Sequence, residues 1–316
     1  GGAHPLTTLW LFLILFLLSQ ILTGITTPGW FEMFAKMISP RKRGRLVGIR
    51  SSIGGIAALG CGVLLTWLLA SFAFPIGYAL AFFAAFLMQI ISLLIQTSLV
   101  EESPSPVGER KPFFAHLREL PRVLRENVYF RNFLIATVFQ IVATMPVGFY
   151  TVSALSQFQA DESMVGKFTI AIVGVQVATS LGIGFLADKY GNKLSLVIAS
   201  VALLFANVAA FVAPTLPWFT LTYIFLGINL GTELLARYNI SIEYGPLNQR
   251  AKYIGLMNTL IAPFYFIGLV GGMVSNAYGY SAVFGLGILA STIGVFLTVF
   301  KVREPRSLSE LELQRV

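Results

Sequence analysis

The segment "GFLADKYGNK", residues 184–193, lies between two long apolar runs and concentrates charge in a short turn. It contains Asp188, which with Asp161 is one of the two aspartates of the chain. Glycines stand near both of its ends, at positions 184 and 191. A compact charged turn of this kind is typical of a connection between two apolar helices.

The composition indicates an all-α polytopic membrane protein. The chain has 316 residues, of which 56% are hydrophobic and only 11% are charged, whereas soluble domains carry about 25% charged residues. Apolar blocks of about 20 residues recur along the chain, and a helix of that length crosses roughly 30 Å of hydrocarbon. Helices also satisfy their own backbone hydrogen bonds, as the bilayer requires.

Nine apolar blocks qualify as membrane spans. Three of them precede a long charged loop and six follow it. The predicted spans are 9–38, 46–72, 75–99, 130–156, 165–187, 193–213, 217–242, 252–277 and 280–301.

The basic residues predict the orientation. Most of the 22 lysines and arginines lie in alternate loops and in the C-terminal tail. The intervening loops, "SFAFPIG", "SQFQADESM", "VAPTLPW" and "NAYGYS", contain none. Because basic loops stay inside, we expect the C-terminus to be cytoplasmic and the protein to be a multi-pass protein of the cell membrane. This bias also accounts for the net charge of +8, so no nucleic-acid partner is inferred.

The loop over residues 100–129 is the longest, and it separates two groups of spans. Its stretch "PFFAHLRELPRVLREN" has apolar residues at helical spacing with arginines between them, which favours an amphipathic helix on the inner membrane surface over a solvated linker. His4 and His116 have no ligand-spaced partner, and Cys61 is expected to be a buried structural thiol. We therefore expect no metal and no cofactor.

Two loops look like copies of one another. "SPRKRGRLVGIR" begins at Ser39 and "GPLNQRAKYIGL" at Gly245, and each has a proline, then an arginine, then a glycine five residues later. The arginine–glycine pairs are Arg43 with Gly48 and Arg250 with Gly255. With matching topology on either side of the charged loop, the copies predict two related bundles, as in many secondary transporters.

The opening segment resembles the signature of the major facilitator superfamily, which reads roughly G-x-L-a-D-r-x-G-r-k. Lys189 is a basic match, while Asn192 departs from the usual basic residue. The remaining matches are Gly184, Leu186, Asp188, Gly191 and Lys193. The resemblance implies a two-bundle transporter fold, in which this motif joins the second and third helices of each six-helix half.

In that register the nine spans correspond to helices four to twelve. A first copy of the motif would then lie before Gly1, so we expect the sequence to be a fragment rather than a natural nine-helix protein. The expected organisation is a truncated N-terminal bundle over residues 1–99, a cytoplasmic linker with the amphipathic helix over 100–129, a six-helix C-terminal bundle over 130–301 and a cytoplasmic tail over 302–316.

By resemblance, the motif forms a conformational gate that braces neighbouring helices in one state and releases them in the other. Gly184 permits close helix approach, Asp188 is expected at a helix start, and Gly191 allows the turn. The predicted gate comprises Gly184, Asp188, Lys189, Gly191, Lys193, Arg43 and Arg250. The alternative is a plain connector with inside-positive charge.

Ionisable groups inside spans are costly and therefore point to function. Asn229, Glu233 and Arg237 follow one another at four-residue intervals, and Glu32 and Lys36 form a similar pair. Glu233, Arg237 and Glu32 are candidates for coupling, with a structural ion pair as the alternative. Candidate cavity residues, each alternatively an interhelical hydrogen-bond partner, are Asn229, Gln140, Thr144, Gln176, Asn258 and Tyr265.

These observations predict a secondary active transporter that moves a small solute by alternating access, with protons as a candidate coupling ion. A transporter-like sensor that binds without moving its ligand is the alternative, and a membrane enzyme is a weaker one. The sequence has no H-E-x-x-H motif and no G-x-x-x-x-G-K-[ST] motif, and its two aspartates lie outside the predicted spans.

Overall fold

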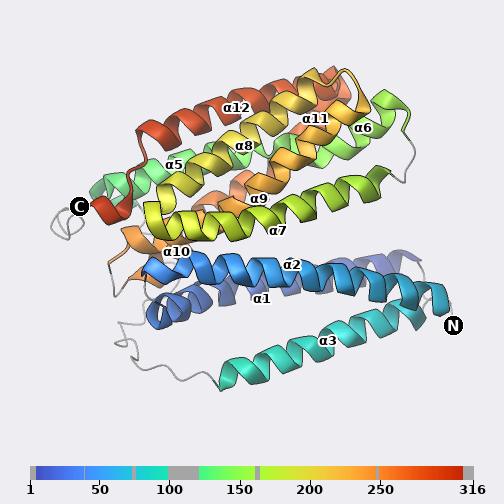
Figure 1. Cartoon of the computed structure of the whole chain (residues 1–316), viewed down its shortest axis with the longest axis horizontal. Coiled ribbons are helices and arrows are strands. Elements are labelled where there is room, and N and C mark those ends of the chain that lie inside the picture. The colour runs from blue at the N-terminus through green and yellow to red at the C-terminus, as the bar shows by residue number, and fades with distance from the viewer. Residues whose placement is uncertain are drawn as a thin grey trace.

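The computed structural model describes residues 5–38, 40–72, 76–98, 121–160, 164–246 and 249–308, and within these ranges it contains helices and no strands. The first group of helices comprises α1 (Pro5–Met37), α2 (Pro40–Ser71) and α3 (Ile76–Thr97). The second group lies beside the first, with α7 against α2 (Figure 1). Its helices are α5 (Val128–Ala143), α6 (Tyr150–Phe158), α7 (Met164–Tyr190), α8 (Asn192–Val212), α9 (Leu216–Tyr244), α10 (Arg250–Ile261), α11 (Ile267–Tyr278) and α12 (Tyr280–Phe300).

Among the described residues, eight helical segments are long and apolar enough to cross a membrane. The chain is therefore a multi-pass membrane protein. The predicted span 46–72 corresponds to α2, which is a continuous helix of 32 residues but is not among these eight segments. Residues 121–126 are helical, but the remainder of the predicted amphipathic helix lies outside the described residues.

Two of the predicted spans are broken helices. A 3-10 turn, η1 (Met145–Phe149), separates α5 from α6, and a second, η2 (Ala262–Phe266), separates α10 from α11. Each turn has a proline near its start, Pro146 and Pro263. Proline has no N–H to donate and clashes with the preceding turn, so it interrupts an α-helix.

A buried polar network holds the first of these breaks. Asn207 of α8 is fully buried and donates to the carbonyl oxygen of Ala143 at 3.1 Å and to Ser291 of α12 at 2.7 Å. The Tyr150 hydroxyl, just after η1, donates to the Asn207 side-chain oxygen at 2.6 Å. One amide therefore ties the end of α5 and the start of α6 to two neighbouring helices.

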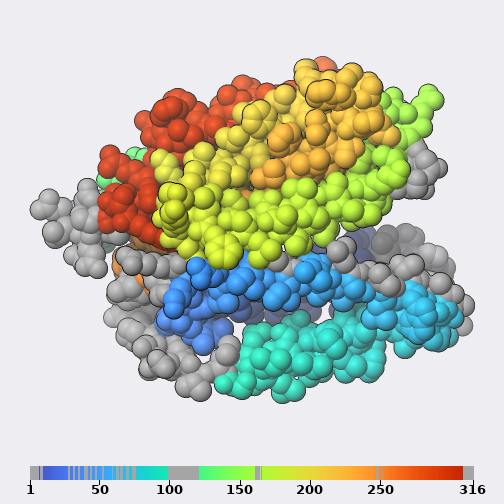
Figure 2. Space-filling model, viewed as in Figure 1, coloured from blue at the N-terminus to red at the C-terminus, as the bar shows by residue number. Residues whose placement is uncertain are grey.

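The two groups meet along α2 and α7 (Figures 1 and 2). A Cβ atom added at Gly48 of α2 would stand 2.5 Å from the Ser180 carbonyl oxygen and 3.3 Å from the Gly184 Cα atom. A Cβ at Gly55 would meet the side chain of Val177. Glycine on both helices thus allows the two backbones to approach closely in the first half of α2 and the second half of α7.

The expectation that Cys61 is buried is wrong, because its side chain is exposed. It lies on α2, whose packing within the described residues is mainly against α7 and α3. The face of α2 that carries Cys61 is not covered by either helix.

A candidate gate at one end of the helices

The turn between α7 and α8 consists of Gly191 alone, since α7 ends at Tyr190 and α8 begins at Asn192. Gly191 has a φ of +89°, which is a left-handed conformation that glycine adopts without steric cost. A Cβ atom at this position would also meet the carboxylate of Glu304. The turn is therefore tight both in its backbone and in its surroundings.

The sequence predicted Asp188 at the start of a helix, and this prediction is wrong, because Asp188 lies in the last turn of α7. Its carboxylate accepts a hydrogen bond of 3.0 Å from the backbone N–H of Arg45, near the start of α2. Arg45 also lies with its guanidinium 5.0 Å from the centre of the Phe185 ring. Because α2 and α7 belong to different groups, this aspartate links the two groups directly.

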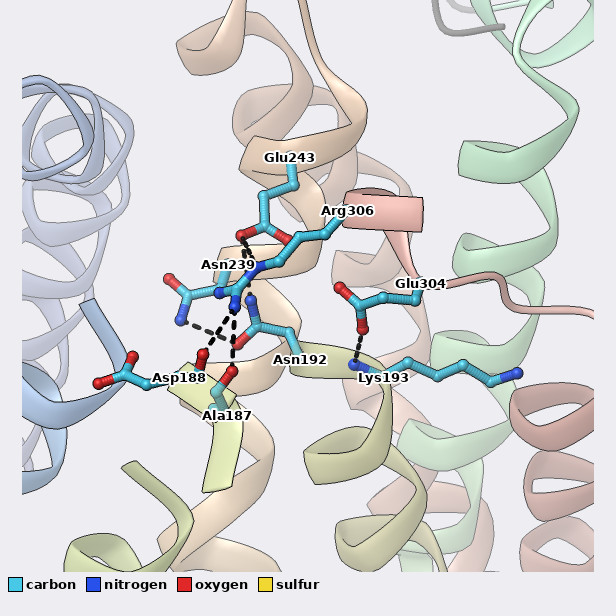
Figure 3. Close-up of polar contacts among 8 residues, drawn as sticks. All are labelled: Ala187, Asp188, Asn192, Lys193, Asn239, Glu243, Glu304 and Arg306. Carbon is cyan, nitrogen blue, oxygen red and sulfur yellow. Dashed lines mark hydrogen bonds and ion pairs between the residues drawn. The ribbon is translucent and has the colours of Figure 1, made fainter. Parts of the chain in front are cut away.

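The segment after α12 folds back onto the end of α7 (Figure 3). Arg306, in the short turn η3 (Pro305–Ser307), donates to the carbonyl oxygens of Ala187 at 3.1 Å and Asp188 at 3.4 Å. Its guanidinium also pairs with Glu243 of α9 at 3.3 Å. The last carbonyls of a helix have no partner within the helix and attract positive charge, so Arg306 stabilises the C-terminal end of α7.

Glu304 does the complementary work at the start of α8. Its carboxylate accepts a hydrogen bond of 2.7 Å from the backbone N–H of Lys193, which is one of the free donors of that helix start. The Lys193 ammonium group donates to the carbonyl oxygen of Val299 at 2.9 Å. The tail segment thus holds both helix ends that flank Gly191.

Asn192 connects this turn to α9. Its side-chain amide donates to Glu243 at 3.1 Å, and its side-chain oxygen accepts from Asn239 at 3.3 Å. An amide can donate and accept at once, which a basic residue at this motif position could not do. Glu243 also lies near Arg250, which is half-buried. Burial lowers the pKa of Arg250, and the charge of Glu243 offsets only part of this decrease.

The structure brings together only part of the predicted gate. Gly184, Asp188, Gly191 and Lys193 take part in it as described above. Lys189 instead lies over the ring of its neighbour Tyr190, at 5.0 Å, and the side chain of Arg43 lies outside the described residues.

Sequence reasoning missed four members of this site: Glu243, Glu304, Arg306 and Asn239. A carboxylate at the end of an apolar span was the available signal for Glu243. For Glu304 and Arg306, the only signal was opposite charges directly after the last span.

A second polar cluster lies within the membrane-spanning part of the second group. Arg237 on α9 has a side chain only 7% exposed, and it pairs with Glu233 at 3.2 Å. The same nitrogen, Nη1, donates to the Tyr265 hydroxyl of η2 at 2.9 Å. Tyr238 donates to the side-chain oxygen of Asn258 on α10 at 3.3 Å. Four of the predicted coupling and cavity residues therefore lie close together, namely Glu233, Arg237, Asn258 and Tyr265.

The other predicted residues lie elsewhere or bond locally. Asn229 donates to the Ala199 carbonyl oxygen on α8 at 2.9 Å, and Thr144 donates to Ile141 one turn earlier in its own helix. Gln140 is buried against Gly294 of α12, and the Gln176 carbonyl lies beside Gly231 of α9. The side chain of Glu32 lies outside the described residues.

Known proteins resemble the chain in sequence and in fold. It is 26% identical over 240 residues to a putative proline/betaine transporter of Staphylococcus haemolyticus, which covers 69% of this chain and 49% of that protein. It is 27% identical over 286 residues to the multidrug resistance protein MdtG of Salmonella schwarzengrund, covering 87% of this chain and 68% of MdtG. The chain thus spans about half the length of the first of these relatives.

The crystal structure of the human organic anion transporter MFSD10 (TETRAN) has the same fold. It superposes with a TM-score of 0.67 at 16% identity, over 85% of this chain and 66% of that one. The family model of the Major Facilitator Superfamily matches residues 2–172 and 133–315, which together include nearly the whole sequence. The chain therefore belongs to the Major Facilitator Superfamily of transporters.

Proposed function

We propose that the protein is a secondary active permease that moves a small solute across the cytoplasmic membrane by alternating access. The observation that carries the proposal is the bond between the Asp188 carboxylate and the Arg45 backbone, which joins the two groups of helices. Alternating access requires the groups to separate at one end while they close at the other. A few bonds concentrated at one end suit such a reversible contact.

In this proposal the gate is closed in the conformation described, and the basic end of the helices faces the cytoplasm. Opening the cytoplasmic side breaks the Asp188–Arg45 bond and separates Gly48 from Gly184. The bonds of Arg306, Glu304 and Asn192 lie within the second group. They keep the α7–α8 turn rigid, so that Asp188 returns to the same position in each cycle.

The function is tested by counterflow with the protein expressed from its complete reading frame and reconstituted into vesicles. The names of the relatives suggest proline and a simple organic anion such as benzoate as labelled solutes, with glucose as a neutral one. Asp188→Asn removes the charge that faces α2, and a helix-end charge interaction contributes about 0.3–2 kcal/mol. We expect a lower exchange rate at normal expression.

The exposed carboxylate Glu126 provides the matched control, and Glu126→Gln should leave the rate unchanged. Equal rates for Asp188→Asn and the wild type would reduce the motif to a plain connector. Specific binding of a solute without any counterflow would instead identify a sensor.

We further propose that Glu233 carries the coupling proton. Its carboxylate lies inside a membrane-spanning helix, its side chain is 22% exposed, and it pairs with Arg237, which also donates to the Tyr265 hydroxyl. Glu233→Gln keeps the shape of the side chain and removes the proton site. It should abolish accumulation driven by a proton gradient while it spares exchange. Gradient-driven accumulation that survives in this variant would make Glu233 a structural partner of Arg237 only.

A further inference from the structure

Arg237 has an unused edge of its guanidinium. The ion pair of this group with Glu233 and its hydrogen bond to Tyr265 are both made by Nη1. Nε is buried and has no hydrogen-bond partner among the described residues. Among the described residues, Nη2 makes no hydrogen bond either. Nε and Nη2 together form the side-on fork of an arginine, which matches the two oxygens of a carboxylate.

An unsatisfied donor of this kind is costly in a membrane protein. A buried N–H without a partner loses its hydration without compensation, and the loss is larger for a charged group. Charged residues within membrane helices generally face a partner or a pathway. Glu233 satisfies one side of Arg237 and leaves the fork open, so this ion pair alone does not explain the arrangement.

The surroundings of Arg237 suit a planar, partly apolar ligand. The Tyr238 ring lies 5.7 Å from the guanidinium carbon, and Tyr265 is 54% exposed. Asn258 on α10 adds a side-chain amide beside Tyr238. Aromatic faces accept the apolar body of a small ligand, while the few polar groups fix its orientation.

We propose that Arg237 is the binding group for the carboxylate of the transported solute, so that the substrate class is small organic carboxylates. The inference rests on the proposed permease function and names the substrate of its membrane-embedded site. The carboxylate binds the Nε/Nη2 fork, and the Tyr265 hydroxyl supports the guanidinium from the opposite side. Glu233, which carries the same charge as the ligand, opposes binding while it is ionised.

The test is a binding measurement on the purified protein, expressed from its complete reading frame, with benzoate and benzamide as probes. The two have nearly the same shape, but only benzoate is charged. We expect benzoate to bind and benzamide to bind at least about tenfold more weakly, because a hydrogen bond between two charged groups is markedly stronger than one that involves a neutral group.

The variants give effects of opposite sign. Arg237→Gln should abolish benzoate binding, and Arg237→Lys should weaken it about tenfold because lysine keeps the charge but lacks the fork. Glu233→Gln should tighten benzoate binding by removing the opposing charge. Arg122→Gln is the matched control, because Arg122 also pairs with a glutamate four residues away but is 78% exposed. It should leave the affinity unchanged.

The proposal is overturned if benzoate does not bind, if it binds equally to the wild type and to Arg237→Lys, or if Glu233→Gln weakens it. The last two outcomes decide the matter even where Arg237→Gln does not fold. Counterflow of glucose without benzoate binding would preserve the permease function and remove this inference. Benzoate binding that follows the predicted order without counterflow of any solute would do the reverse.

Discussion

Gly48 shows how much a single missing side chain controls at the seam between the two groups. It is buried on α2, and its position faces backbone atoms of α7 rather than a flexible side chain. Backbone cannot yield as the end of a side chain can, so even one methyl group forces the helices apart. The geometry of this residue therefore sets the distance over which the Asp188–Arg45 bond can form.

Gly48→Ala should open this end of the seam, since the added Cβ would stand 2.5 Å from the Ser180 carbonyl oxygen. Overpacking of this kind costs about 1–3 kcal/mol, and separation of the groups relieves it. In a background without Cys61, spin labels at the exposed positions 42 and 190 should report a longer mean distance. Gly54→Ala on the same helix, where the added Cβ meets open space, should leave that distance unchanged, and an equal shift in both variants would contradict the prediction.

At the residue scale, the sequence predicted where the turn between two helices lies but not all of the contacts of that turn. The spacing of Gly184, Asp188 and Gly191 identified the turn, because glycines and a charged residue between two apolar runs are typical of a connection between two membrane helices. It could not show that Asp188 bonds to α2, since that contact joins positions 143 residues apart. Asn192 looked like a departure from the motif, yet its amide makes two bonds that a basic side chain could not make together.

At the scale of elements, the segment after α12 works as a strap across the α7–α8 turn. Glu304 binds the start of α8, and Arg306 binds the end of α7. Each charge meets the helix end that attracts it, the anion at the N-terminus and the cation at the C-terminus. The strap also reaches α9 through Glu243, so one short segment fixes three helices of the second group.

Arg306→Gln should lower the stability of the second group of helices. The variant leaves Glu243, whose side chain is only 9% exposed, with Asn192 but without its paired cation. Breaking such a bond costs about 1–3 kcal/mol, so the thermal unfolding midpoint in detergent should fall. Arg122→Gln removes an exposed pair and should leave the midpoint unchanged. An unaltered midpoint in Arg306→Gln would show that the strap contributes no stability.

Long apolar blocks located the helices but did not show how the helices are interrupted. The predicted spans 130–156 and 252–277 were continuous, although Pro146 and Pro263 lie within them. Proline in a membrane helix is tolerated when neighbouring groups satisfy the freed backbone. Whether they do depends on residues such as Asn207, which is far away in the sequence. The strap was missed for a similar reason, since no periodicity indicates where a tail folds back.

At the scale of the whole molecule, the polar contacts of the α7–α8 turn gather at one end of the helices. The helix ends that carry Arg45, Asp188, Lys193 and Arg306 lie together, and the close approaches of α2 to α7 lie in the adjoining halves of those helices. Charged groups stay outside the hydrocarbon when they can. In the proposed permease, the candidate gate would therefore lie at the membrane surface, and the polar cluster around Arg237 lies deeper in the second group.

The orientation of this assembly gives the last prediction: residue 108 faces the cytoplasm and residue 161 faces the outside. Both positions lie outside the described residues, so the prediction rests on the distribution of lysine and arginine between alternate loops. Single cysteines replace Gly108 or Asp161 in a background without Cys61, which is necessary because Cys61 is exposed. In intact cells a membrane-impermeant thiol reagent should label position 161 only, and permeabilised cells should show labelling at both. Labelling of position 108 from outside would reverse the orientation, and the gate around Asp188 would then close the external side.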